Sequence, residues 1–147
     1  MSLTEDNRIQ DLAMKYFGQD DYYIECYKLY KSGKKKINLM PLLFGGYWLI
    51  FKGMIVYGLI YFSISSLILK VVPFEYARFI LIIINGSLVI WGNQLYFTSV
   101  ERKARKIVTN FESNTDQLQA LYSENKISFI RGIIISILVG FITSYLR

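Results

Sequence analysis

Long apolar runs alternate with shorter polar segments along this chain. Three runs contain at most one charged residue each, namely 39–69, 79–100 and 132–146. An α-helix needs about 20 apolar residues to cross the roughly 30 Å hydrocarbon core of a bilayer. The pattern therefore predicts an all-α integral membrane protein with about three transmembrane helices. The predicted spans cover about 54–69, 77–98 and 129–146.

The first apolar run is too long for one straight span. As a single helix, 39–69 would extend about 46 Å and would carry its only charge, Lys52, near the centre. A lysine at that depth costs at least about 2.5 kcal/mol on insertion scales. We therefore predict a short interfacial or re-entrant helix over 39–51. Lys52 and Trp48 then mark an interfacial corner between this helix and the first span.

The polar N-terminal region predicts a helical hairpin over residues 1–36. Ser2 and Glu5 form a capping-box pattern ahead of apolar residues at helical spacing, which indicates a helix over 4–17. Asp20 is the expected N-cap of a second helix over 21–32.

The second predicted helix carries a stripe of tyrosines, Tyr23, Tyr27 and Tyr30. Such a stripe is typical of packing against the first helix or at the membrane interface, where tyrosine has one apolar end and one wet end. A face that binds a protein partner is the alternative.

Residues 99–128 are predicted to form a cytoplasmic loop segment. The second span continues as a helix into a basic collar, "ESNTD" interrupts it, and a short amphipathic helix follows over 115–125. With the lysines ahead of the first apolar run, the collar predicts contact with anionic lipid headgroups. The residues concerned are Lys34, Lys35, Lys36, Arg102, Lys103, Arg105 and Lys106.

Basic residues also predict the orientation. Seven Lys or Arg precede the first apolar run and five lie in 101–128, against two in 70–78 and one at the C-terminal end. The positive-inside rule places the N-terminal hairpin and the 99–128 loop in the cytoplasm, with 37–147 as the membrane domain. The polar start lacks the apolar core of a signal peptide. A last apolar segment that re-enters instead of crossing is an open alternative.

Polar side chains within the predicted second span need partners, because an amide in lipid is costly unless it is hydrogen-bonded. Asn85, Ser87 and Asn93 are these intramembrane polar residues, and we expect them to face other helices. A polar transport route is the alternative.

The third apolar run contains small residues at four-residue intervals, a spacing that lets two helix backbones approach closely. This helix-packing or oligomer face consists of Gly132, Ser136, Gly140 and Ser144. The spacing does not say whether the neighbouring helix comes from the same chain or from a second copy.

Composition narrows the possible chemistry. The chain has no histidine, which removes the commonest general base and transition-metal ligand, and its one cysteine, Cys26, has no partner for an intrachain disulfide. The predicted spans contain no Asp, Glu or His. The net charge is +6, and the basic residues lie beside the apolar runs. The chain has no motif that reads a nucleic-acid groove, so we expect lipid and not nucleic acid as the partner. We expect no enzyme activity, no cofactor and no metal site.

Two motif segments carry a family resemblance that covers about residues 22–106. They are "YYIECYKLYKSGKKKINLMPLLFGGYWLIFKGM" and the later "GNQLYFTSVERKARKI". The chain resembles a family of small bacterial inner-membrane proteins classed as a domain of unknown function. The matching positions are Asn38, Gly45, Trp48, Lys52, Asn93 and Tyr96. Leu39 stands where the family usually has tryptophan, and Gly46 where it has proline. The resemblance implies a multi-pass protein of the bacterial inner membrane and implies no reaction.

Three hypotheses on function follow from these features. The first is a non-enzymatic bacterial membrane subunit or adaptor that docks a protein partner through its cytoplasmic helices. The second is a homo-oligomeric pore or small transporter. The third is an immunity protein against a membrane-acting toxin or bacteriocin, which rests on analogy with other small multi-span proteins.

Overall fold

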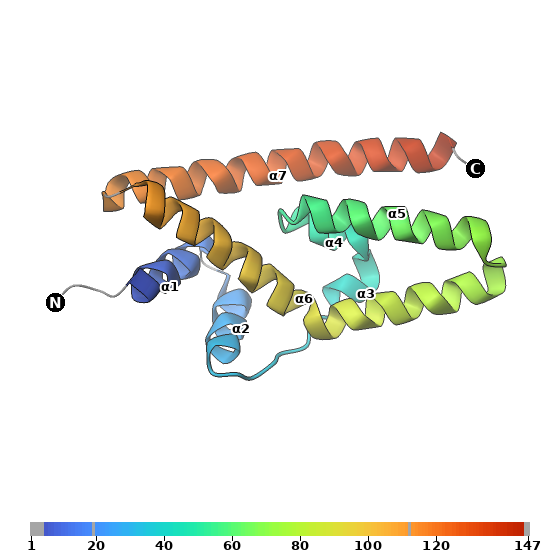
Figure 1. The fold of residues 1–147 in the computed structure, drawn as a ribbon, viewed down its shortest axis with the longest axis horizontal. Helices are drawn as coiled ribbons and strands as arrows, with labels where there is room; N and C mark the ends of the chain where they lie inside the picture. The colour runs from blue at the N-terminus through green and yellow to red at the C-terminus, as the bar shows by residue number, and fades with distance from the viewer. Residues whose placement is uncertain (1–4, 19, 112, 146–147) are drawn as a thin grey trace. The chain divides into compact units, whose positions relative to one another are not determined.

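The computed structural model describes residues 5–18, 20–111 and 113–145, with the side chains there except those of 114, 124–126, 128, 129, 136 and 139–145. Every regular element in these ranges is an α-helix, which confirms the predicted all-α class for the described chain. In order, the helices are α1 (Glu5–Tyr16), α2 (Asp21–Lys31), α3 (Met40–Phe44), α4 (Gly46–Phe51), α5 (Ile55–Val71), α6 (Phe74–Asn110) and α7 (Asn114–Tyr145) (Figure 1).

The chain divides into two compact units. Unit 1 combines the described residues up to Lys36 with Asn93–Ile127, and unit 2 combines Ile37–Gly92 with the described residues from 128 onward. Helices α6 and α7 therefore each contribute to both units. The predicted N-terminal hairpin is grouped with the second half of α6 and the first part of α7.

The two helices of the hairpin form where the local pattern predicts them. The buried face of α1 consists of apolar and aromatic residues at helical spacing, Ile9, Leu12, Ala13 and Tyr16. The side chain of Asp20 caps α2, because it accepts a hydrogen bond from the Tyr23 backbone N–H at 3.4 Å. The predicted helices over 4–17 and 21–32 are confirmed to within about one residue at each described end.

The predicted single helix over 39–51 is wrong, because the segment forms two short helices, α3 and α4. Gly45 separates them with φ 51° and ψ −128°, a backbone conformation that only glycine adopts without strain. The predicted change of direction after α4 is confirmed. Lys52 is the C-cap of α4, Gly53 has φ 72°, and helix resumes at Ile55.

Helix α6 is long and apolar enough to cross a membrane, and it is the one such helix that a search of the described residues identifies. Only 6% of its most apolar window is buried, whereas the core helix of a water-soluble protein is mostly buried. Helix α5 is a shorter apolar helix of 17 residues. Beyond the predicted span, α6 continues through the basic collar to Asn110, as expected.

The predicted separation of a 115–125 helix from a 129–146 span is wrong. Helix α7 runs without interruption from Asn114 to Tyr145, because the polar stretch between the two predicted helices contains no proline or glycine. The predicted interruption at "ESNTD" is confirmed between α6 and α7. There the Ser113 carbonyl oxygen accepts from the backbone N–H of Gln117, and the Ser113 hydroxyl oxygen accepts from that of Thr115.

Candidate functional site

Unit 1 is built around a cluster of aromatic rings from three helical segments. Phe17, directly after α1, lies against Tyr27 of α2 and Phe97 of α6, with ring centroids 5.3 and 5.7 Å apart. The Tyr27 and Phe97 rings are 5.4 Å apart, and Tyr23 lies 5.2 Å from Tyr96. All five residues are at most 7% exposed. Tyr23 and Tyr27 therefore serve internal packing, and they do not form an exposed face.

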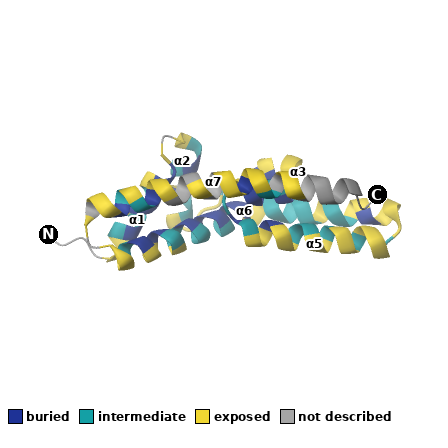
Figure 2. Ribbon diagram, turned by 90° about the horizontal axis from the view of Figure 1, so that it is seen from above, coloured by how far each residue is buried: buried dark blue, intermediate teal, exposed yellow. Residues whose placement is uncertain are grey.

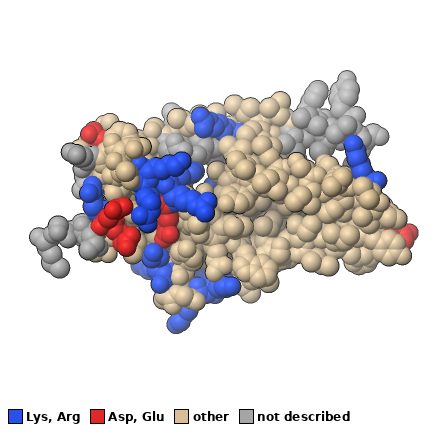
Figure 3. All heavy atoms as spheres, viewed as in Figure 1, with Lys and Arg blue, Asp and Glu red and all other residues tan. Residues whose placement is uncertain are grey.

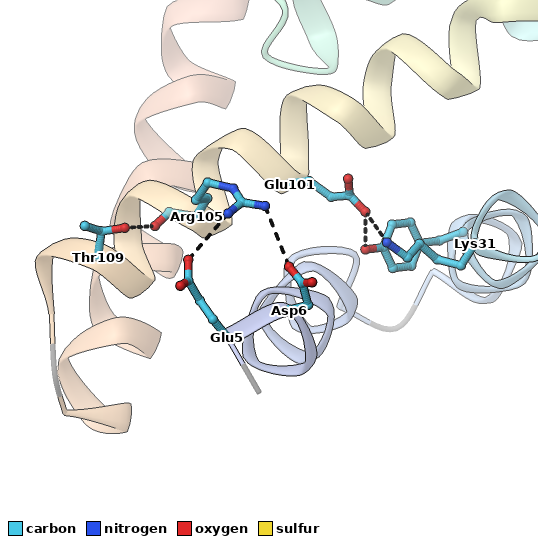
Figure 4. A network of polar contacts seen from close by, with 7 residues as sticks. Glu5, Asp6, Lys31, Glu101, Arg105 and Thr109 are labelled. Atoms are coloured by element: carbon cyan, nitrogen blue, oxygen red, sulfur yellow. Dashed lines mark hydrogen bonds and ion pairs between the residues drawn. The ribbon is translucent and has the colours of Figure 1, made fainter. Parts of the chain in front are cut away.

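Glu101 of α6 receives two hydrogen bonds from α2. The Tyr27 hydroxyl donates to Glu101 Oε1 at 2.8 Å, and Lys31 Nζ donates to the same oxygen at 3.1 Å (Figure 4). Burial raises the pKa of Tyr27, and the hydrogen bond to the Glu101 carboxylate raises that pKa further. The neutral hydroxyl is therefore the form that holds α2 to α6. Composition and periodicity did not single out Glu101, although it is the first charged residue after the second apolar run.

Arg105 connects the start of α1 to α6. Its guanidinium lies 3.4 Å from a carboxylate oxygen of Glu5 and 3.8 Å from one of Asp6, and both pairs are exposed (Figure 4). Exposed ion pairs contribute about 0–1 kcal/mol each, so these contacts orient α1 more than they stabilise it.

The seven basic residues predicted to contact anionic lipid differ in their surroundings. Lys36 pairs with Glu25 at 2.6 Å, Lys103 donates to the Tyr16 hydroxyl at 3.3 Å, and Arg105 pairs as described above. The other four, Lys34, Lys35, Arg102 and Lys106, are exposed. Charged side chains gather over α1, α2 and the second half of α6 (Figure 3). Contact with lipid headgroups stays a prediction.

Asn93 of α6 binds the backbone at Lys36, where the first segment of unit 1 ends. Its Nδ2 donates to the Lys36 carbonyl oxygen at 3.1 Å and lies 3.5 Å from the Tyr22 hydroxyl, and the residue is 5% exposed. Asn93 is thus a hydrogen-bonded packing residue in unit 1.

In unit 2, Asn85 joins two helices, because the Tyr61 hydroxyl of α5 donates to Asn85 Oδ1 of α6 at 2.7 Å. Ser87 donates instead to the Ile84 carbonyl oxygen of its own helix. The predicted role as a link between helices therefore fits Asn85. The partner, Tyr61, is a site residue that the sequence did not indicate.

Glycines on α5, α6 and α7 allow α3 and α4 to pack closely against these helices in unit 2. A Cβ added at Gly92 of α6 would lie 3.1 Å from the Trp48 ring, and one added at Gly132 of α7 would lie 3.1 Å from the Ile50 carbonyl oxygen. Gly58 of α5 has even less room, beside Ile50. Gly132 thus packs within the chain. The other members of its predicted face, Ser136, Gly140 and Ser144, have side chains outside those described.

Trp48 and Lys52, the predicted interfacial corner, differ in burial. Trp48 is 4% exposed, whereas Lys52 is half-buried and ends α4. Their position relative to a membrane surface stays a prediction.

In the described part of the chain, the Cys, Asp and Glu side chains form no group of three or more that could hold a metal ion. Cys26 is 2% exposed, and burial raises the pKa of its thiol, which disfavours the reactive thiolate. No family model, curated protein or solved structure matches this chain. The family resemblance of its two motif segments therefore stays a prediction.

Proposed function

We propose that the chain is a non-enzymatic, multi-pass membrane subunit of the bacterial inner membrane, with unit 2 in the bilayer and unit 1 in the cytoplasm. In this proposal unit 1 docks a protein partner. The observation that carries the membrane assignment is the apolar outer surface of unit 2.

Many large apolar residues of α5 and of the first half of α6 are exposed, and Figure 2 colours much of α5 as exposed. Val71 is 73% exposed, Phe74 72% and Ile83 71%. Water-soluble monomers rarely expose contiguous apolar patches larger than about a few hundred Å². Helices also satisfy their own backbone hydrogen bonds, as a lipid environment requires. A bilayer accounts for both properties.

The lengths of the helices support three crossings of the bilayer. Helix α5 extends about 26 Å at 1.5 Å per residue, which is close to the hydrocarbon thickness, and Lys70 in its last turn has a stem long enough to reach headgroups. The unit 2 parts of α6 and α7 supply the other two crossings. The excess of basic residues ahead of Ile37 and after Asn93 favours a cytoplasmic location for unit 1.

The aromatic core of unit 1 supports an adaptor role. Because Phe17, Tyr27 and Phe97 hold the helices together, the exposed charged residues are displayed on a fixed scaffold. The surface that remains for a partner is this charged outer face, which includes Arg102 and Lys106. The hydrogen bonds of Asn85 and Asn93 favour packing roles over a polar transport route.

Alkaline carbonate extraction of native membranes tests the membrane assignment. We expect the protein to stay in the membrane pellet, and its release into the supernatant would refute the assignment.

Site-specific photo-crosslinking in cells tests the adaptor role. A crosslinking residue in place of Arg102 or Lys106 should give a discrete adduct with another protein. The same residue in place of Leu59, on the apolar face of α5, is the matched control and should give no protein adduct. Absence of adducts at both unit 1 positions would contradict docking at this face.

A further inference from the structure

We propose that Met40–Phe51 is a re-entrant hairpin whose tip is Gly45, so that the chain enters and leaves this segment on the same side of the bilayer. This inference rests on the proposed location of unit 2 in the membrane. It assigns Lys34 and Lys52 to the same membrane face and leaves α5, α6 and α7 as the three crossings.

The segment begins beside Val89 of α6, close to Gly92, where the unit 2 part of this helix ends. The Asn38 backbone N–H donates to the Val89 carbonyl oxygen at 3.2 Å, and Asn38 Oδ1 accepts from the Met40 backbone N–H at 3.0 Å. Asn38 is 2% exposed. Pro41 then lies next to Gly92, since a Cβ added at that glycine would be 3.5 Å from the proline ring.

The tip of the segment, Gly45, contacts α5 and α6 at other levels than the two ends of the segment do. A Cβ added at Gly45 would lie 2.8 Å from the Tyr61 hydroxyl oxygen and 3.4 Å from Asn85 Oδ1. Gly45 is therefore level with Tyr61 of α5 and with Asn85 of α6. These two side chains are hydrogen-bonded to each other across the tip.

The returning arm is α4, which packs against α5. A Cβ added at Gly58 would overlap Ile50 Cγ1 and would lie 3.2 Å from the Gly46 carbonyl oxygen. The chain then turns at Gly53 and starts α5 at Ile55.

Two independent distances along the helices give the direction of the segment. Helices α5 and α6 are antiparallel neighbours joined at Val72 and Pro73 (Figure 1). On α6, the tip level at Asn85 is about 6 Å from the start level at Val89. On α5, the tip level at Tyr61 is about 9 Å from the helix start at Ile55. On both helices the tip level is therefore nearer the joined end than the level where the arm begins or ends, so both arms extend from Gly45 away from the joined end and open on the same side.

The length and the backbone of the segment agree with this path. Even as one continuous helix, Met40–Phe51 would extend only about 18 Å, well short of a bilayer core. Irregular backbone at membrane depth is tolerated where protein covers it. Gly45 is buried, its N–H donates to the Pro41 carbonyl oxygen at 2.8 Å, and its carbonyl accepts from the Trp48 N–H at 3.2 Å.

Cysteine labelling of the full chain in membrane vesicles tests the hairpin. In a Cys26→Ala background, single cysteines replace Lys34, Lys52 or Glu75, the last being an exposed residue just after the α5–α6 connection. Each variant is treated with a membrane-impermeant maleimide in right-side-out and in inverted vesicles. We expect Lys34→Cys and Lys52→Cys to react from the same side, and Glu75→Cys to react from the opposite side.

The outcomes separate the hairpin from the proposed function. Reaction of Lys52→Cys from the side opposite Lys34→Cys, in a protein that resists carbonate extraction, would refute the hairpin while leaving the membrane assignment intact. Reaction of all three cysteines from one side would refute the three crossings. Release of the protein by carbonate would refute the membrane assignment itself. Carbonate resistance and monodispersity in detergent show whether the Cys26→Ala background keeps its fold, and Cys26→Ser is the replacement if it does not.

Discussion

A methyl group added at Gly58 of α5 would overlap Cγ1 of Ile50 and lie 3.2 Å from the carbonyl oxygen of Gly46. Neither neighbour is the free end of a flexible side chain, so α4 and α5 would have to separate. Overpacking of this kind costs about 1–3 kcal/mol, more than the gain of about 1 kcal/mol from replacing glycine by alanine in a helix. We expect Gly58→Ala to lower the unfolding temperature of the detergent-solubilised protein.

Gly86 of α6 provides the matched control, because a Cβ added there would have no heavy atom within 4 Å. Gly86→Ala should leave the unfolding temperature unchanged or raise it, since only the helix propensity gain of about 0.5–1 kcal/mol applies. Equal effects of the two substitutions would contradict the close packing at Gly58.

Tyr27 makes stability depend on alkaline pH. Burial and the hydrogen bond to Glu101 raise its pKa in the folded protein, whereas an unfolded tyrosine ionises near pH 10. The Tyr27 contribution is therefore fully present below about pH 10 and decreases as the pH rises above it, by at most about 1.4 kcal/mol per pH unit. We expect Tyr27→Phe to show a shallower loss of stability between pH 9 and 11 than the unchanged chain, measured by thermal unfolding.

An exposed tyrosine of the same unit controls for this effect. Tyr122 is 68% exposed, so Tyr122→Phe should keep the pH dependence of the unchanged chain. If both substitutions flatten the pH profile equally, the contact between Tyr27 and Glu101 is not its cause.

At the scale of elements, aromatic burial and not ion pairing holds the hairpin of α1 and α2 on α6. Phe97 is 1% exposed and contacts rings from both sides of the hairpin, including Phe17 and Tyr27. Truncating a buried phenylalanine costs about 3–5 kcal/mol, whereas losing an exposed ion pair such as Arg105 with Glu5 costs about 0–1 kcal/mol.

Limited proteolysis of the full chain measures this difference. Phe97→Ala should expose the hairpin to cleavage and increase the cleavage rate by about a hundredfold or more, since each 1.4 kcal/mol changes the open population tenfold. Arg105→Ala removes the exposed ion pairs with both Glu5 and Asp6 and should change the rate by less than about thirtyfold. A larger effect of Arg105→Ala than of Phe97→Ala would show that the ion pairs dominate.

Elements with local signals were predictable from the sequence, and those set by distant contacts were not. Helix α2 follows from its Asp20 cap, and the end of α4 follows from the cost of Lys52 in lipid. The separation of α3 from α4 at Gly45 was missed, because a glycine permits a break in a helix without requiring one, and the close packing of Gly45 against Tyr61 is not visible in the sequence. The continuity of α7 was missed because polar residues were interpreted as an interruption.

The candidate site shows the same limit. The charges of the basic collar are visible in the sequence, but the pairing of Arg105 with Glu5 joins residues 100 positions apart. The tyrosine stripe was predicted as a packing surface, yet its main partner, Phe97, lies on a helix that periodicity alone could not match to it. Local patterns give the faces of helices, and only tertiary structure decides which faces meet.

At the scale of the whole molecule, the two tryptophans can test the proposed placement of unit 2 in the bilayer, because they differ in exposure. Trp91 is 48% exposed on the apolar surface of α6, whereas Trp48 is 4% exposed. In vesicles of lipids with brominated acyl chains, we expect strong quenching of Trp91 and weak quenching of Trp48. Comparison of the unchanged chain with Trp91→Phe separates the two signals.

An aqueous quencher completes this measurement. Acrylamide should quench Trp91 weakly if lipid covers α6. Strong quenching by acrylamide together with no quenching by brominated lipid would contradict the placement of unit 2 in the bilayer.

The contact between Ile50 and Gly132 also has a consequence for the time course of synthesis. A Cβ added at Gly132 would lie 3.1 Å from the Ile50 carbonyl oxygen, yet the ribosome adds Gly132 only 82 residues after Ile50 (132 − 50 = 82). At a synthesis rate of about 5–20 residues per second, Gly132 is added roughly 4 to 16 s after Ile50. During that interval the newly made α4 lacks one of its covering helices. If unit 2 lies in the bilayer as proposed, a chain truncated before α7 should be a preferred substrate for membrane quality-control proteases.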